Sequence, residues 1–243
     1  MGGNSTKPAS ECLLDAASLK ARFAAAVADS AFPCLGAKAA FNGGSYLLSV
    51  YDRLASDSSS EALASDLESF TQSEMCETNP YASFVAIFRS PLASDEEGFE
   101  RLLWSQLQKL HQLDATKYKW DSSVVSDPNH PLFSFSLAGR ALYVIGMHDR
   151  SSRLARRFPW PTLVFNPHEQ FERLRHDGKW KRMQEAIRAR DVILQGSTNP
   201  MLSDFGEQSE ARQYSGRIVD KEWQPPFRAE PTDLPAPRCP FAH

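Results

Sequence analysis

One histidine of this chain lies in a turn that is crowded with arginines. His148 directly follows an apolar run, and residues 149–152 after it are turn-forming. Arg153, Arg156 and Arg157 come next, all within nine residues of the histidine. A neutral imidazole can bind a metal, and a guanidinium group is a permanent cation that binds carboxylates. A heme needs both groups, because its iron takes an axial ligand and its two propionates need cationic partners.

Cys34 is the alternative iron ligand. It follows Phe32 and Pro33, and none of the four cysteines of the chain forms a CxxC pair. A structural zinc site or a disulfide framework is therefore not predicted. A thiolate pushes electron density onto heme iron and favours O–O cleavage, whereas a histidine supports several chemistries. Each residue also has a plainer interpretation, which is a surface histidine in a polar turn or a buried, inert cysteine.

The polar segment 195–217 carries candidate groups for binding a substrate. Because it has few apolar residues, it must be solvated or line a polar pocket. Its carboxylates Asp204, Glu207 and Glu210 could pair with a cationic substrate. The alternative is a surface loop followed by a short helix. His168, at the predicted start of another helix, is as suitable for capping that helix as for binding a ligand.

Two apolar runs position His148. Residues 133–137 and 141–145 flank the tripeptide 138–140, Ala-Gly-Arg, and this pattern predicts a β-hairpin. The second strand leads directly to His148. A rigid strand fixes the base of the loop that follows it, so the end of this hairpin is a favourable place for a functional group.

The other predicted elements are short strands and helices that do not alternate strictly. Strands are predicted at 46–51, 84–88 and 162–165, from their apolar and β-branched residues. Helices are predicted at 13–27, at 55–70, from Ser94 onward with Glu97 completing a capping box, from 166 to about 176, and at 179–192. Such an order favours an α+β fold with a mainly antiparallel sheet over a doubly wound fold.

Length and composition indicate one domain. At 243 residues the chain can bury one substantial core. We expect a disordered N-terminus at 1–11, a heme-binding catalytic domain at 12–222, and a proline-rich tail at 223–243 that packs on this domain. The net charge of -3 favours neither nucleic acid nor a membrane as a partner. No apolar run approaches the length of about 20 residues that a membrane span needs, and no signal peptide is evident, so a cytoplasmic protein is expected.

Four long segments carry a resemblance to a known family. They are FPCLGAKAAFNGG at 32–44, FSFSLAGRALYVIGMH at 133–148, SSRLARRFPWPTLVFNPHEQFERLR at 151–175, and IRARDVILQGSTNPMLSDFGEQSEARQYSGR at 187–217. Together with the terminal CPF at 239–241, they resemble the YqcI/YcgG family. Within that family they are similar to the heme-dependent N-oxygenases, such as the guanitoxin-pathway N-hydroxylase.

The resemblance implies an oxidoreductase, namely a monooxygenase that uses heme b and O2 to N-hydroxylate a guanidine or amine of an amino acid-like substrate. The family cysteine and histidine fall on Cys34 and His148, and its arginines fall on Arg153, Arg156 and Arg157, which would bind the propionates. His148, or else Cys34, would hold the iron. No GxGxxG nucleotide motif is present, so an external reductase or ferredoxin is expected to supply electrons. The alternative is a heme-binding sensor or carrier without turnover.

Overall fold

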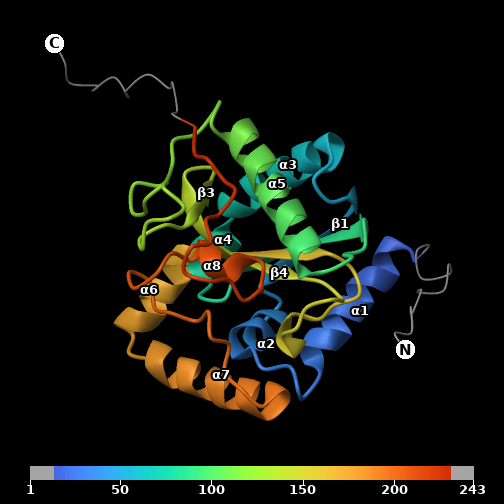
Figure 1. The fold of residues 1–243 in the computed structure, drawn as a ribbon, viewed down its shortest axis with the longest axis vertical. Helices are drawn as coiled ribbons and strands as arrows, with labels where there is room; N and C mark the ends of the chain where they lie inside the picture. Colours follow the sequence, from blue (N-terminus) through green and yellow to red (C-terminus); the bar gives the residue numbers. More distant parts are fainter. Residues whose placement is uncertain (1–13, 231–243) are drawn as a thin grey trace.

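Five strands form one mixed sheet in the computed structural model, which describes residues 14–230 (Figure 1). The strands follow the order β1 (Tyr46–Arg53), β2 (Ser83–Ser90), β5 (Thr162–Pro167), β4 (Arg140–Met147) and β3 (Phe135–Leu137). Only the β1–β2 pair of this sheet is parallel, and the other three pairs are antiparallel. The prediction of a single α+β domain with a mainly antiparallel sheet is confirmed.

The predicted hairpin is present as β3 and β4. Its two turn residues, Ala138 and Gly139, both have positive φ angles, of 52° and 72°. This geometry is typical of the two-residue turns whose twist matches that of the flanking strands. Since β4 ends at Met147, His148 is the first residue beyond the strand, as the sequence predicted.

Helices cover both faces of the sheet. They are α1 (Ala16–Ala28), α2 (Leu35–Asn42), α3 (Asp57–Thr71), α4 (Glu74–Thr78), α5 (Glu96–Asp114), α6 (His168–His176), α7 (Trp180–Gln195) and α8 (Ala211–Tyr214), with a 3₁₀ turn, η2, at Leu154–Arg156. No helix within residues 14–230 is long and apolar enough to cross a bilayer.

The N-cap of α5 differs from the prediction. Asp95, not Ser94, caps the helix, and its Oδ1 accepts a hydrogen bond from the backbone N–H of Gly98 at 2.6 Å. The expected capping box with Glu97 is therefore wrong by one residue. Both side chains can cap a helix, and the carboxylate also interacts favourably with the positive end of the helix dipole.

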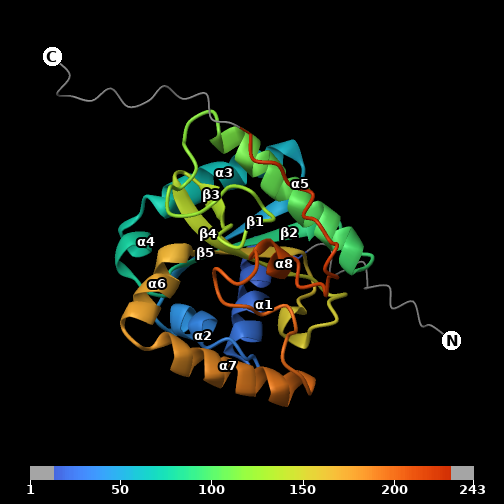
Figure 2. The ribbon, with the colours of Figure 1, turned by 60° about the vertical axis from the view of Figure 1, so that its left-hand side comes forward.

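Side chains alternate across the sheet and separate two apolar layers. On β4, Leu142 and Val144 belong to the main core beneath α3 and α5, whereas Ile145 and Met147 belong to a second layer with α1. Neighbouring residues of a strand point to opposite faces, so each strand contributes to both layers. Figure 2 shows α3 and α5 on one side of the sheet and α1, α2 and α7 on the other. The second layer is the one that contains the candidate site.

The described part of the proline-rich segment, residues 223–230, lies along α5 (Figure 2). Phe227 packs against Trp104 with ring centroids 6.1 Å apart, and the backbone N–H of Glu230 donates to His111 Nε2 at 2.8 Å. The segments 1–11 and 231–243, including the CPF at 239–241, lie outside the described residues.

Candidate functional site

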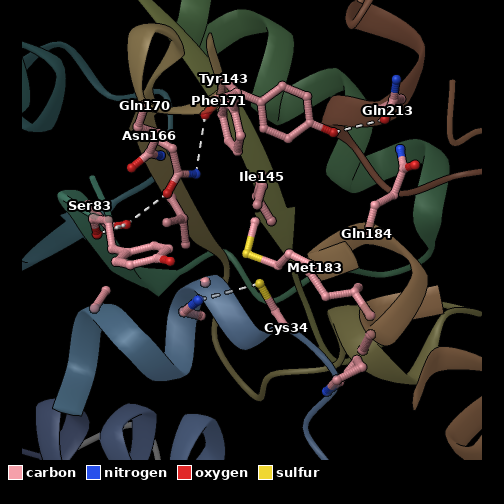
Figure 3. A pocket seen from close by; sticks show the side chains of 18 of the residues that line it. Cys34, Ser83, Tyr143, Ile145, Asn166, Gln170, Phe171, Met183, Gln184 and Gln213 are labelled. Carbon is pink, nitrogen blue, oxygen red and sulfur yellow. Dashed lines mark hydrogen bonds between the residues drawn. The ribbon is translucent and has the colours of Figure 1, made fainter. Parts of the chain in front are cut away.

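A cavity of about 290 Å³ lies between the sheet and the helices α1, α2, α6 and α7. Its walls are mostly apolar. Figure 3 shows Tyr143 and Ile145 reaching into it from β4, Cys34 from the start of α2, and Met183 and Gln184 from α7. Every contributing residue of β4 has an odd number because only that face of the strand is turned toward the cavity.

Cys34 is the N-cap residue of α2. Its Sγ accepts a hydrogen bond from the backbone N–H of Ala37 at 3.4 Å, and the side chain lines the cavity (Figure 3). Burial raises the pKa of the thiol, while the N–H groups of Ala37 and Gly36 and the charge of Arg156 oppose this rise. The sulfur therefore lies in a largely apolar cavity, at the positive end of a helix.

The three predicted arginines have three different environments. Arg153 forms a buried ion pair with Asp191 of α7. Arg156 lines the cavity and donates to the backbone oxygens of Gly146 at 3.1 Å and Gln213 at 3.3 Å. Arg157 is exposed, and its Nε donates to a backbone oxygen in the loop, outside the cavity lining.

Arg156 is the cavity arginine that is best placed to bind an anion. Within residues 14–230 no carboxylate lies within 4 Å of its guanidinium, and burial lowers its pKa. Arg188 of α7 also lines the cavity without an ion pair inside the described part of the chain, and the sequence gave no reason to single it out. A buried guanidinium favours an anionic partner strongly, because its charge is poorly solvated.

Of the three predicted carboxylates, the structure brings only Glu210 to the cavity. Glu210 is 5% exposed, and its Oε2 accepts a hydrogen bond from the hydroxyl of Tyr214 at 3.3 Å. Asp204 accepts a hydrogen bond from Gln184 at 2.7 Å but does not line the cavity. Glu207 is exposed and accepts from the backbone N–H of Asp204.

His168, the first residue of α6, lies beside Glu210. Its Nδ1 is 3.4 Å from Glu210 Oε1, its ring centroid is 4.4 Å from that of Phe205, and it is 5% exposed. It makes no side-chain capping bond to α6. The sequence left capping and ligand binding as equal interpretations, and the structure places the ring in the cavity wall.

Amide and hydroxyl groups complete the polar part of the cavity. Tyr143 donates its hydroxyl hydrogen to Gln213 Oε1 at 2.9 Å, and burial raises the pKa of this phenol to about 12. Asn166 accepts from the hydroxyl of Ser83 at 2.7 Å (Figure 3). Gln170 Oε1 is buried without a hydrogen-bond partner among the described residues. The cavity therefore combines apolar walls with a small number of acceptors and donors, as ligand sites commonly do.

His148 lies on the other side of the sheet from the cavity. It is 1% exposed, its ring stacks on Phe99 of α5 with centroids 4.2 Å apart, and it is not part of the cavity lining. Its Nδ1 has no hydrogen-bond partner within residues 14–230. The structure thus brings together Cys34, Arg153, Arg156 and Glu210, and it separates His148, Arg157, Asp204 and Glu207 from them.

Burial makes His148 a source of acid sensitivity. Its apolar surroundings lower its pKa to about 4, below the value of about 6.5 that a histidine has in an unfolded chain. Between these values the unfolded state binds more protons, so the free energy of unfolding should fall as the pH falls from about 6.5 to about 4. We expect His148→Phe to remove this loss, which is on the order of 2 kcal/mol. Urea unfolding at several pH values measures it.

A difference between variants is needed because Asp114 titrates in the opposite sense. Burial raises its pKa to about 6, so its contribution to stability falls as the pH rises from about 4 to about 6. His176→Phe is the matched control, since the side chain of His176 is 92% exposed. A pH profile of His148→Phe that runs parallel to the parent profile would contradict the prediction.

Comparison with known proteins places the chain in a family. No group of three or more His, Cys, Asp or Glu side chains within residues 14–230 is arranged to hold a metal ion. No curated protein and no solved structure shows significant similarity to the chain. The model of the YqcI/YcgG family matches residues 23–228, which include every cavity residue described above. The chain belongs to the YqcI/YcgG family.

Proposed function

We propose that the protein is a heme-dependent monooxygenase that N-hydroxylates a guanidine or amine nitrogen of an amino acid-like substrate, with O2 and electrons from an external reductase or ferredoxin. One observation carries this proposal. A single, mostly apolar cavity contains a cysteine sulfur, a guanidinium without a carboxylate partner and a buried carboxylate, at Cys34, Arg156 and Glu210.

The residues of the cavity fit heme b. A porphyrin needs apolar walls, and Ile145, Met147 and Val164 provide them from the sheet. It needs an axial ligand, and Cys34 offers a sulfur that binding to iron would hold as a thiolate. Its propionates need cations, for which Arg156 is available. Arg153 is less suited to this task, because Asp191 already neutralises it.

Between the two iron ligands that the sequence left open, the geometry favours Cys34. Cys34 lines the cavity, whereas His148 faces α5 across the sheet and its ring is covered by Phe99. When bound, a thiolate-ligated heme supplies the activation of O2. The protein itself excludes bulk water from this space and positions the substrate.

Glu210 is the group that would orient the substrate. A carboxylate and a guanidinium form two parallel hydrogen bonds, which fix both the position and the angle of the nitrogen to be oxidised. The hydroxyl of Tyr214 holds one oxygen of Glu210, so the direction of the carboxylate is set before a substrate binds.

Optical spectra of hemin-loaded protein, reduced under carbon monoxide, test this proposal. We expect the parent protein to show the red-shifted band of thiolate-ligated heme and Cys34→Ala to lose it. His148→Ala is the matched control and should keep the parent spectrum. A protein that fails to take up stoichiometric hemin would contradict the proposal. A spectrum that changes in His148→Ala but not in Cys34→Ala would contradict the assignment of Cys34.

A further inference from the structure

The imidazole of His168 lies between two carboxylates that differ in exposure. Its Nδ1 is 3.4 Å from Oε1 of Glu210, whose side chain is 7% exposed. Its Nε2 is 3.6 Å from Oε1 of Glu172, whose side chain is 54% exposed. The ring itself is 6% exposed at its side chain and forms part of the cavity wall. One side of the ring thus faces the cavity carboxylate, and the other faces a carboxylate in contact with solvent.

Imidazole is the side chain that can relay a proton in such a position. It accepts a proton at one ring nitrogen and releases one from the other, which no carboxylate or amide does through a ring. Both distances exceed the usual hydrogen-bond length of about 2.7–3.2 Å, and Nδ1 has no hydrogen-bond partner among the described residues. Catalytic contacts are often long in the absence of substrate and shorten when it binds.

We propose that Glu210, His168 and Glu172 form a relay that carries a proton from a cationic substrate nitrogen in the cavity to the solvent. The inference rests on the proposed function, because that function requires a neutral nitrogen. The relay residues come from α6 and from the residue preceding α8, and the sequence singled out only Glu210 for the site.

The chemistry explains the need for the relay. An ammonium or guanidinium nitrogen has no lone pair to donate to an oxidant, so R–NH3⁺ must first become R–NH2 and release one proton. The neutral amine then reacts as R–NH2 + O2 + 2e⁻ + 2H⁺ to give R–NHOH + H2O, with the electrons supplied by the external reductant. The first proton leaves the substrate nitrogen for Glu210, passes through the two ring nitrogens of His168, and reaches the solvent at Glu172.

The charged and titratable groups around the relay are few. Tyr214 donates a hydrogen bond to Glu210 from the core side. Arg175 pairs with Glu172 at the surface end. The other side chains that face the ring of His168 are the aromatic rings of Phe171 and Phe205. The relay therefore has a carboxylate at each end and an apolar enclosure around its ring.

Turnover of two substrates that differ in basicity tests the relay. The probes are L-arginine, whose guanidinium is strongly basic, and L-canavanine, whose oxyguanidine is several pH units less basic. We expect His168→Gln to lower kcat for L-arginine by about 10²-fold or more at neutral pH, but to lower kcat for L-canavanine far less. In this variant kcat for L-arginine should also rise about tenfold per pH unit, in step with the fraction of neutral guanidine, and the parent profile should be flatter.

Glu172→Gln is expected to slow L-arginine turnover in the same direction. Glu169→Gln is its matched control, because Glu169 lies on the same helix and pairs with Arg173 at 3.0 Å, away from the ring of His168. Equal losses for both substrates in His168→Gln, or parent-like rates, would overturn the relay. Failure of the parent protein to oxidise either substrate would instead overturn the proposed function, and the relay with it.

A second measurement does not depend on turnover. The ¹⁵N chemical shifts of the ring nitrogens of His168, measured in heme-free protein, report which nitrogen carries the proton. We expect Glu210→Gln and Glu172→Gln each to change these shifts and Glu169→Gln to leave them unchanged. Shifts that respond to neither relay carboxylate would overturn the relay, whatever the protein oxidises.

Discussion

Asp191→Asn is expected to lower the free energy of unfolding by about 3–5 kcal/mol. Asp191 pairs with Arg153, and their side chains are only 9% and 6% exposed. The substitution preserves shape but removes the negative charge, so the guanidinium remains buried without compensation. The pair joins α7 to the loop after β4, and Arg153 also donates to the backbone oxygen of Ser197 at 3.0 Å. Urea unfolding measures the loss.

Two comparisons sharpen this experiment. Glu169→Gln removes a surface ion pair whose side chains are 39% and 49% exposed, and should cost less than about 1 kcal/mol. The double variant Arg153→Met with Asp191→Leu removes both charges and should recover most of the lost stability, because an apolar pair needs no compensation. A loss below about 1 kcal/mol in Asp191→Asn would show that the pair does not hold α7 in place.

Glu210→Gln is expected to retain heme and to lose about a hundredfold in kcat/KM for a cationic substrate. The side chain keeps its volume and its hydrogen bond from Tyr214 but loses the charge that a buried cation needs. Removal of one partner of a buried pair costs about 3 kcal/mol, and each 1.4 kcal/mol corresponds to about tenfold. Steady-state kinetics and the heme content of the purified variant measure the two outcomes.

Glu207→Gln is the matched control for this variant. Glu207 lies three residues earlier, is exposed, and is outside the cavity lining, so its substitution should leave kcat/KM unchanged. Parent-like turnover of Glu210→Gln would remove Glu210 from the substrate site. Loss of heme from Glu210→Gln would instead assign the residue to the integrity of the cavity.

Local structure could be predicted from the sequence because its determinants are local. The β3–β4 hairpin depends on a two-residue turn between alternating apolar runs, and all of these residues are adjacent in the chain. The start of α5 was misplaced by one residue because Ser94 and Asp95 are both good caps and only the structure shows which one is used. The short helix α2 lacked a distinctive pattern and was not predicted.

The candidate site could be predicted only in part, because its residues meet from distant parts of the chain. Cys34, Arg156 and Glu210 come from three separate segments, and no spacing rule relates them. His148 illustrates the difficulty. It continues the even-numbered face of β4, with Leu142 and Val144, which faces the main core, whereas the cavity is on the odd-numbered face. The alternation was visible in the sequence, but the face that would carry a cavity was not.

The cavity also replaces packing that the second apolar layer would otherwise have. Val85, Ile145 and Val164 are turned toward a hollow, whereas the opposite face of the same strands is covered by α3 and α5. A molecule that fills this space therefore acts as a removable piece of the interior. At a hundredfold excess over its dissociation constant it would add about 2.7 kcal/mol to the free energy of unfolding. A shift in melting temperature is thus a chemistry-blind screen for natural ligands of this protein.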